Sequence, residues 1–431
     1  MKKSIIALTL LATLAGCSYD VSQPAQTSAR TTAYSQAVID KAVEDYTKGF
    51  IAQQPALATS LNLSTEVAGD YQTRWPDYSS KGMLAMQNSM KESVEALKAF
   101  ELDALSDKNR LHLSVNQVIA GYYQGALGFP GGYIDTWGGH LPYVVSQISG
   151  PLIDIPAVLQ DQHGISSKAD AQNYLKRLAA FEALGKAVKS KVLDDAEKGI
   201  VLPKALFPNT FKFLDNFVAP KAKEHGLVTH FAKKLDKLDG LSEKEKQALI
   251  AQATELVAKK VYPVYRDIKQ TMVQLQPSAP REDGIWAQPN GERFYQHEIT
   301  YLADSNLTAD EIHQVGLDEV ARITKEMDAI LISQGMTEGS VGKRLIKLVD
   351  MPQFVYEDSD EGRARLLADL NKEIDKVMAK APELFATMPT QEVIVKRVPV
   401  ASQAGAPGGS YMPPALDGSR PGVYSINLKD M

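Results

Sequence analysis

Apolar residues recur at intervals of three and four positions over much of the chain, which is the spacing that predicts amphipathic helices. The pattern covers residues 79–100, 107–123, 167–198, 242–275 and 308–333. The clearest stripe lies in the last range and contains Ile312, Val315, Val320, Ile323, Met327 and Ile330. Glu311, Asp318, Lys325 and Asp328 lie off this stripe, so we expect it to be a buried face.

Two of these helices begin with a capping signal. Thr308 and Glu311, like Ser242 and Glu245, are spaced so that each side chain accepts a hydrogen bond from the backbone N–H of the other. Pro263 lies inside the pattern of residues 242–275, where its missing N–H predicts a kink.

The pattern changes near the C-terminus. Residues 392–400 are rich in β-branched side chains and residues 423–428 alternate, so both predict strands, separated by a glycine-containing loop at 401–409. The sequence therefore predicts a mainly α fold: an elongated or bilobed helical body with a small β element near the C-terminus.

The first residues predict a lipoprotein signal peptide. Lys2 and Lys3 precede an apolar run that is shorter than the roughly 20 residues needed to cross a bilayer. The run ends at Leu14-Ala-Gly-Cys17, which resembles the lipobox of lipoprotein signal peptidase. Cys17 is the only cysteine of the chain, and we expect it to carry the lipid. An ordinary secretory signal with an incidental cysteine is the alternative.

This signal divides the sequence into three segments. Residues 1–16 are the signal peptide, residues 17–33 the lipidated cysteine and a flexible tether rich in Ser, Thr, Gln and Ala, and residues 34–431 the helical domain. The acyl chains, each contributing about 0.8 kcal/mol per buried methylene, are expected to hold the protein on a membrane. Position 18 is Ser rather than Asp, which by resemblance to sorted lipoproteins favours the outer membrane, facing the periplasm.

Composition excludes several classes of function. Hydrophobic residues make up 44% and charged residues 23%, as in an ordinary globular protein. Removal of the signal peptide leaves 45 of the 47 basic residues against 52 acidic ones, a net charge of −7. We therefore expect no nucleic-acid partner. With Cys17 modified, no disulfide or thiolate metal site is available.

Few histidines stand in a pattern that suggests chemistry. His297-Glu298 begins the zinc-peptidase pattern His-Glu-x-x-His, but Tyr301 occupies the place of the second ligand, so we favour a role other than metal binding. His313 flanks the apolar stripe and is interpreted as a packed or surface histidine. Glu319 lies on the stripe, where a structural ion pair is the favoured reading. His140 ends a glycine-rich loop that either lines a pocket or only turns the chain.

Two segments carry a resemblance to a known family. The first is Tyr411-Met-Pro-Pro-Ala-Leu-Asp-Gly-Ser-Arg-Pro-Gly-Val-Tyr-Ser-Ile-Asn427. The second, residues 296–323, contains Glu-Ile-His-Gln-Val-Gly-Leu-Asp-Glu-Val-Ala-Arg-Ile at 311–323. Both resemble signatures of the bacterial domain-of-unknown-function 885 family, and the resemblance extends over residues 35–431.

The resemblance implies a helical zinc metallopeptidase of the gluzincin type with a cleft. Members of the family carry a His-Glu-x-x-Pro-Gly-His-His motif shortly after the Asn strand, whose histidines bind zinc and whose Glu activates water. An intact member is thus expected to hold zinc. This sequence stops at Met431, before such a motif. No metal ligand and no catalytic residue is therefore carried over, and no cofactor is expected in this chain.

The resemblance does assign substrate-binding residues. Tyr411 would hydrogen-bond a substrate carbonyl, and Arg420 would pair with a substrate carboxylate through its guanidinium. Asp417 would orient Arg420 or cap the turn at Gly418. Purely structural roles in the turn and in the strand ends are the alternative for each residue.

Two functional hypotheses follow. The first is that the chain is the amino-terminal part of a lipid-anchored, periplasmic zinc-metallopeptidase-like protein and is catalytically incompetent without its zinc motif. The second is a non-enzymatic helical lipoprotein that binds peptides or cell-wall fragments. Under the first, residues 393–400 and 423–428 are expected to have exposed strand edges.

Overall fold

The computed structural model describes residues 34–398, 400, 403, 408–429 and 431, so the signal peptide, Cys17 and the tether lie outside the described residues. The described chain divides into two compact units. Unit 1 contains the residues up to 59 together with 64–304, and unit 2 contains residues 60–63 and 305–431. The predicted mainly helical class, with a few strands near the C-terminus, is confirmed.

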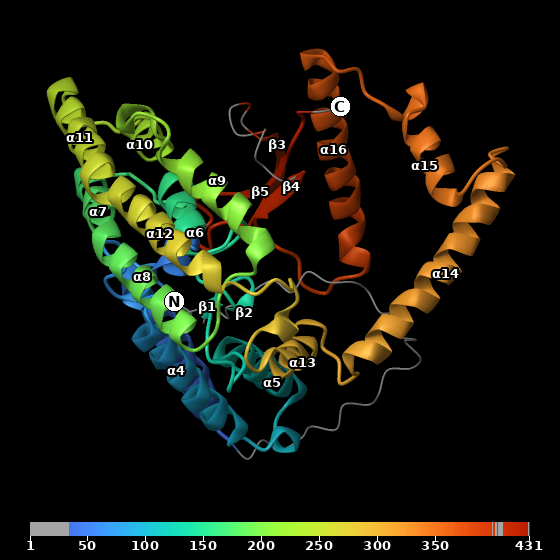
Figure 1. Cartoon of the computed structure of the whole chain (residues 1–431), viewed down its shortest axis with the longest axis horizontal. Helices are drawn as coiled ribbons and strands as arrows, with labels where there is room; N and C mark the ends of the chain where they lie inside the picture. The colour runs from blue at the N-terminus through green and yellow to red at the C-terminus, as the bar shows by residue number, and fades with distance from the viewer. Residues whose placement is uncertain (1–33, 399, 401–402, 404–407, 430) are drawn as a thin grey trace. The chain divides into compact units, whose positions relative to one another are not determined.

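Unit 1 is a set of helices with one small hairpin (Figure 1). Its first half contains α1 (Gln36–Gln53), α2 (Pro55–Ser60), α3 (Thr65–Ala68), α4 (Ser80–Lys98), α5 (Asp107–Gln124), β1 (Tyr133–Asp135), β2 (Gly139–Leu141) and α6 (Pro151–Ala157). Its second half contains α7 (Lys168–Ala179), α8 (Phe181–Glu197), α9 (Phe207–Val218), α10 (Gly226–Asp236), α11 (Glu243–Leu256), α12 (Tyr262–Leu275) and α13 (Gly291–Leu302). Short 3-10 turns lie between several of these helices.

The predicted helical ranges correspond to observed helices. Residues 79–100 and 107–123 form α4 and α5, whereas residues 167–198 form two helices, α7 and α8, that meet at Ala180. The range 242–275 forms α11 and α12, joined by a π-helical turn (Val257–Val261). Pro263 follows this turn at the start of α12. A wider turn accommodates the missing N–H of proline and its crowded ring, so the helix continues through this position.

The main core of unit 1 lies among α7 to α12. Figure 1 shows α7 and α8 beside α11 and α12. The largest apolar side chains at the centre of this core are fully buried: Tyr174, Phe181, Phe207, Phe231 and Tyr265. The rings of Tyr174 and Phe231 stack with centroids 4.5 Å apart, a geometry that adds to the burial of apolar area.

Unit 2 combines long helices with a three-stranded sheet. It contains α14 (Ala309–Ser333), α15 (Val341–Val349), α16 (Asp360–Lys380), β3 (Val393–Arg397), β4 (Gly409–Met412) and β5 (Gly422–Ile426). The strand order is β3–β5–β4, with β5 parallel to β3 and antiparallel to β4. The two strands expected from sequence are present, but β4 was not expected. Because β5 is paired on both sides, the expected exposed edge at residues 423–428 is wrong for residues 423–426. Among the described residues, β3 and β4 are the edge strands of this sheet.

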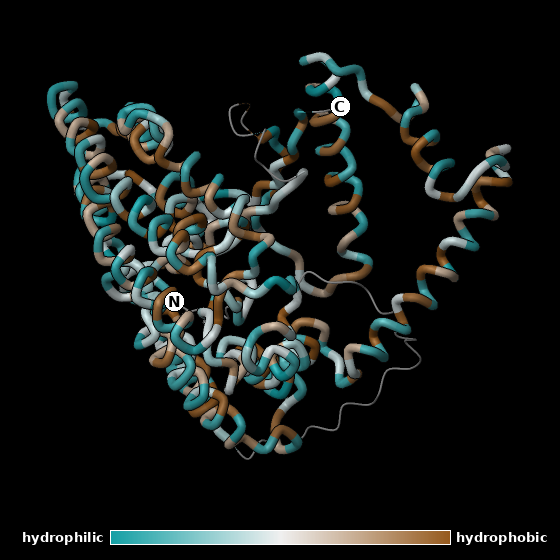
Figure 2. The backbone as a smooth tube through the Cα atoms, viewed as in Figure 1, coloured by the Kyte–Doolittle hydropathy of each residue, from teal (hydrophilic) through white to brown (hydrophobic). Residues whose placement is uncertain are grey.

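The apolar stripe of α14 is not buried, which corrects the expectation drawn from its periodicity. The exposed fractions of Val315, Val320 and Ile330 are 52%, 65% and 63%, and only Leu331 of this helix is buried. Figure 2 shows hydrophobic and hydrophilic positions alternating along α14. The predicted capping box of Thr308 and Glu311 is confirmed. The helix is thus built as an amphipathic element whose apolar face lacks a cover in the described chain.

Candidate functional site

Strand β4 and the segment that joins it to β5 in unit 2 carry the three residues predicted to bind substrate. Tyr411 lies on β4, opposite Tyr424 of β5. The exposed fraction of Tyr411 is 40%. A Cβ atom added at Gly422 would lie 2.7 Å from the Tyr411 hydroxyl oxygen. Glycine at position 422 therefore makes room for the Tyr411 side chain on the sheet.

Arg420 donates to carbonyl groups of its own chain. Its Nη1 donates to the carbonyl oxygen of Pro413 at 2.8 Å, and its Nη2 donates to that of Ser60 at 2.6 Å. Burial lowers the pKa of the Arg420 guanidinium, which lies partly under this loop. These bonds fix the loop to residues 60–63 and occupy part of the donor set that a substrate carboxylate would use.

Asp417 caps the turn before Arg420. Its Oδ1 accepts from the backbone N–H and the hydroxyl of Ser419 at 3.0 and 2.7 Å, and its Oδ2 accepts from the Asn62 side-chain amide at 2.8 Å. These bonds, chiefly that from the Ser419 hydroxyl, lower the pKa of the carboxyl. Gly418 has a positive φ of 76°, as such a turn requires. The structure records no hydrogen bond between Asp417 and Arg420 among these described side chains, so of the two predicted roles the turn is the one that its contacts serve.

The donor set of the described residues does not fit the zinc site that the family resemblance implies. No group of three or more His, Cys, Asp or Glu side chains within the described ranges is arranged to hold a metal ion. The Nδ1 of His297 lies 2.9 Å from Glu298, and its ring stacks on Tyr301. His140 is held on both ring nitrogens: Nδ1 accepts from the Ala126 N–H, and Nε2 bonds the carbonyl of Gly131. His140 itself does not line the cavity described next, but Tyr133 and Ile134 of the same loop do, so this loop both turns the chain and lines a pocket.

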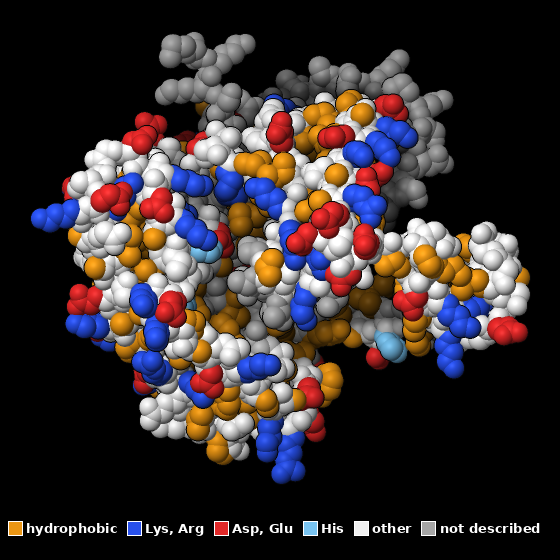
Figure 3. Space-filling model, turned by 90° about the horizontal axis from the view of Figure 1, so that it is seen from above, with side chains coloured by type: hydrophobic (Ala, Val, Ile, Leu, Met, Phe, Trp, Pro, Cys, Tyr) orange, Lys and Arg blue, Asp and Glu red, His pale blue; other side chains and the backbone are white. Residues whose placement is uncertain are grey.

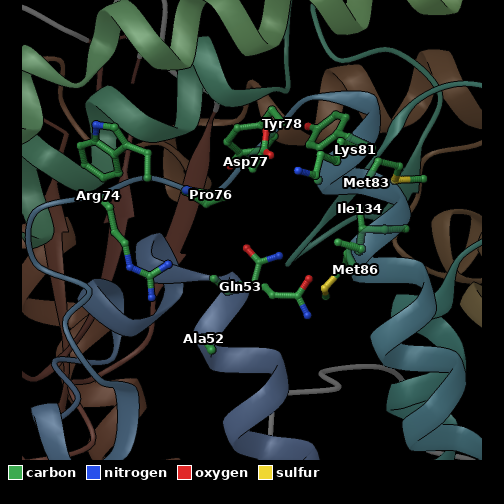
Figure 4. Close-up of a pocket in the computed structure, with 15 residues that line it drawn as sticks. Ala52, Gln53, Arg74, Pro76, Asp77, Tyr78, Lys81, Met83, Met86 and Ile134 are labelled. Atoms are coloured by element: carbon green, nitrogen blue, oxygen red, sulfur yellow. The ribbon is translucent and has the colours of Figure 1, made fainter.

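Unit 1 contains a cavity that sequence reasoning missed (Figure 4). Its volume is about 270 Å³, and it lies where the end of α1, the segment 74–78 and the first turn of α4 meet β1. The polar residues that line it are Gln53, Gln54, Arg74, Asp77, Tyr78 and Lys81. These residues come from two short stretches of sequence without a recognised motif, so only the packing of α1 against α4 brings them together.

Comparison with known proteins assigns the family. Residues 55–431 match the model of a family described as "Bacterial protein of unknown function (DUF885)". The chain belongs to the DUF885 family. Residues 1–18, which include Cys17, match a prokaryotic membrane lipoprotein lipid attachment site, so this DUF885 member is a membrane-anchored lipoprotein. Among the described helices, none has the length and apolarity to pass through a bilayer.

Two solved structures resemble this DUF885 chain. The crystal structure of "the putative lipoprotein from Colwellia psychrerythraea" is 38% identical with a TM-score of 0.88, over 92% of this chain and 68% of the other. "A putative lipoprotein of unknown function from Shewanella oneidensis" is 15% identical with a TM-score of 0.56, over 92% of this chain and 65% of the other. The second shows a shared fold alone. This chain thus spans about two-thirds of the length of either protein, and no curated protein matches it.

Proposed function

We propose that this chain is the amino-terminal part of a lipid-anchored metallopeptidase-like protein and that it has no hydrolytic activity by itself. The observation that carries the proposal is the unequal coverage: 92% of this chain aligns with only 68% of the Colwellia protein, at a TM-score of 0.88. A longer protein of the same fold thus has room for a further segment. On the family resemblance, this proposal assigns the zinc motif His-Glu-x-x-Pro-Gly-His-His to such a segment.

The exposed apolar surface of unit 2 supports this proposal. Besides the stripe of α14, the exposed large apolar side chains of unit 2 include Ile346, Val349, Phe354, Val377, Leu384 and Phe385. Figure 3 shows hydrophobic side chains across the surface of this part of the molecule. Soluble proteins rarely expose so many large apolar side chains on neighbouring elements unless another segment or partner covers them. A following segment of the longer protein would supply that cover.

The proposed location is the periplasmic face of the outer membrane. The lipid attachment site holds the protein on a membrane. Position 18 is Ser, whereas an Asp at this position would resemble an inner-membrane retention signal. Separation of the two membranes on a density gradient, followed by protease treatment of intact and permeabilised cells, tests this location. Recovery with the inner membrane, or digestion in intact cells, would contradict it.

A peptidase assay tests the catalytic part of the proposal. The purified chain is expected to show no chelator-sensitive cleavage of a mixed peptide library after incubation with zinc. A chimera tests the other half, with residues 1–431 followed by the part of the Colwellia protein that this chain does not span, which we propose to be C-terminal. The chimera is expected to bind about one zinc ion per chain by metal analysis. Chelator-sensitive cleavage by the present chain, or a folded chimera without zinc, would overturn the proposal.

The cavity in unit 1 favours a second candidate function, a lipoprotein that binds peptides or cell-wall fragments without cleaving them. A finished binding module is expected to unfold in one cooperative transition and to elute as a single species on size-exclusion chromatography. A broad transition with aggregation would instead favour the truncated form, because the apolar face of α14 would then be free to associate.

A further inference from the structure

The cavity of unit 1 has an electropositive side. The Nε of Arg74 donates to the carbonyl oxygen of Asp70 at 2.8 Å. This bond does not use the two terminal nitrogens of the guanidinium. Lys81 lies in the first turn of α4, and neither cation has a carboxylate within 4.0 Å in the described part of the chain. The N-terminus of α4, a helix of 19 residues, adds its partial positive charge at the same place. This side of the cavity therefore favours a negatively charged group.

The one acidic residue of the lining is already engaged. Oδ1 of Asp77 accepts from the backbone N–H of Ser79 at 2.9 Å, just before α4 begins. Its carboxylate thus offsets part of the positive charge of the helix terminus. Two cations, Arg74 and Lys81, still face one anion, Asp77, in the lining of the cavity. The second oxygen of Asp77 can accept a hydrogen bond from an N–H donor of a ligand.

Side-chain amides supply the second part of the site. Gln54 is 7% exposed and lines the cavity, and its amide is not among the buried polar groups that lack a partner in the described chain, so a ligand in the cavity can reach it. A ligand group that both donates and accepts can hydrogen-bond with this amide. The Nε2 of the neighbouring Gln53 donates to the carbonyl oxygen of Gly49, and the side-chain oxygen of Gln53 can still accept a hydrogen bond. Figure 4 shows Gln53 and Lys81 on opposite sides of the central space.

The remaining lining is largely apolar. Trp75, Met86 and Ile134 are 9%, 4% and 6% exposed and contribute aromatic and aliphatic surface to the cavity. Trp75 is held in place because its Nε1 donates to the carbonyl oxygen of Arg177 at 3.0 Å. An apolar lining with a few directed polar groups is the usual composition of a small-ligand site.

We propose that this cavity binds the carboxyl-terminal end of a short peptide. Arg74 and Lys81 hold the free carboxylate, the side-chain amides of Gln53 and Gln54 pair with the last peptide group, and an apolar side chain lies against Met86 and Ile134. The volume of about 270 Å³ suits two or three residues. The site deepens the second candidate function, on which it rests for its ligand class, and does not depend on the proposed peptidase relationship.

Calorimetric titration of the full chain tests the site with a matched pair of probes. The first is the tripeptide Ala-Ala-Leu with a free carboxylate, and the second is the same tripeptide as its carboxamide. The free acid is expected to bind at least about tenfold more tightly, because a charge-assisted pair is lost with the amide. Inorganic phosphate serves as a third probe, which separates a peptide site from a general anion site.

Substitutions locate the binding. Lys81→Ala, Arg74→Ala and Gln54→Leu are each expected to weaken binding of the free acid by about tenfold. Lys91→Ala is the control, since Lys91 is an exposed lysine of the same helix that does not line the cavity. Circular dichroism establishes that each variant is folded.

Each outcome of these titrations bears on the proposal. The proposal is supported if the wild type prefers the free acid and if this preference is lost in Lys81→Ala and in Arg74→Ala. Binding that all folded variants retain overturns the cavity assignment but leaves peptide binding as a function of the protein. Absence of peptide binding overturns both. Phosphate binding with the same sensitivity to substitution and no peptide binding overturns the ligand class.

Discussion

Arg177 is a buried charged side chain of unit 1, and hydrogen-bond acceptors of the same chain surround it. Arg177 has an exposed fraction of 0%. Its Nη2 donates to the hydroxyl of Thr59 at 2.7 Å and to the carbonyl oxygen of Tyr71 at 2.8 Å, and its Nη1 lies 3.0 Å from Nδ1 of His163. The guanidinium also lies over the ring of Trp75. One side chain thus ties α7 to the N-terminal segments of the unit.

Arg177→Lys is therefore expected to destabilise the protein. Lysine retains the charge but has no planar fork, so several buried acceptors would lose their donor. The expected loss is about 3 kcal/mol in the free energy of unfolding, measured by denaturant titration. Lys176→Ala, at the exposed neighbouring position, is the control and should change the free energy by no more than about 0.5 kcal/mol. Equal effects of the two substitutions would refute this role of Arg177.

Asp154 gives the protein a pH dependence. Burial, together with the charge of Asp135, raises the pKa of Asp154 to about 7. The folded state therefore holds a proton that the unfolded state releases near pH 4, and this contribution to stability is lost as the pH rises from about 4 to 7. Asp154→Asn removes the effect. By pH 8 the free energy of unfolding of the variant is expected to have risen relative to that of the wild type by on the order of 4 kcal/mol, and a difference that does not vary with pH would contradict the assignment.

At the scale of single residues, the sequence predicts only what local spacing encodes. The turn at Asp417 and Gly418 and the ion pair of Glu319, which forms with Arg322, follow from neighbouring positions. The cavity residue Gln54 could not be found in this way, because its burial depends on packing between α1 and α4 and not on any pattern around it. Whether Tyr411 and Arg420 contact a substrate stays a prediction.

Helix periodicity predicts that an element exists but not what covers it. The stripe of α14 has the spacing of a buried face, and its capping box forms as expected, yet the stripe is exposed. The hairpin of β1 and β2 was missed because each strand has only three residues in a glycine-rich stretch. It contacts both the preceding helix α5 and α4, and α4 is distant in sequence.

Because packing contributes little to α14, its cap should matter more than usual. The Thr308 hydroxyl accepts from the Glu311 N–H at 3.3 Å, and Glu311 accepts from the Thr308 N–H at 2.8 Å. Thr308→Ala is expected to cost about 1 kcal/mol, seen as faster amide hydrogen exchange in the first turn of α14. Thr324→Ala, at an exposed position in the middle of the helix, serves as control. Unchanged exchange in the Thr308 variant would show that the cap is not limiting.

A pair of adjacent positions tests the exposure of the stripe. Ile330 is 63% exposed and Leu331 is 3% exposed. Ile330→Lys is expected to change the free energy of unfolding by no more than about 0.5 kcal/mol, whereas Leu331→Lys should cost about 3 kcal/mol or more, because a charge would enter a buried site. The comparison is made by denaturant unfolding. A large cost at Ile330 would mean that the stripe is covered in the protein as purified.

For the whole molecule, the strongest statements concern its family and its anchor. The chain belongs to the DUF885 family and carries a lipid attachment site at residues 1–18. Its mainly α class was predictable because helical periodicity and caps repeat along the chain. The sequence left an elongated and a bilobed body open, and it did not place the boundary near residue 304, because residues 60–63 join unit 2 through contacts that are distant in sequence. The proposed peptidase relationship depends on a segment beyond these units.

The intact mass of the native protein, extracted from membranes of the source bacterium, tests this central proposal most directly. The proposal predicts a lipid-modified protein with a mass well above 47.1 kDa, because in it the working protein is longer than this chain and includes a zinc-binding segment. A mass that corresponds to residues 17–431 plus lipid would contradict the account. The chain would then act in its present length, and peptide binding in the cavity of unit 1 would be the function to measure.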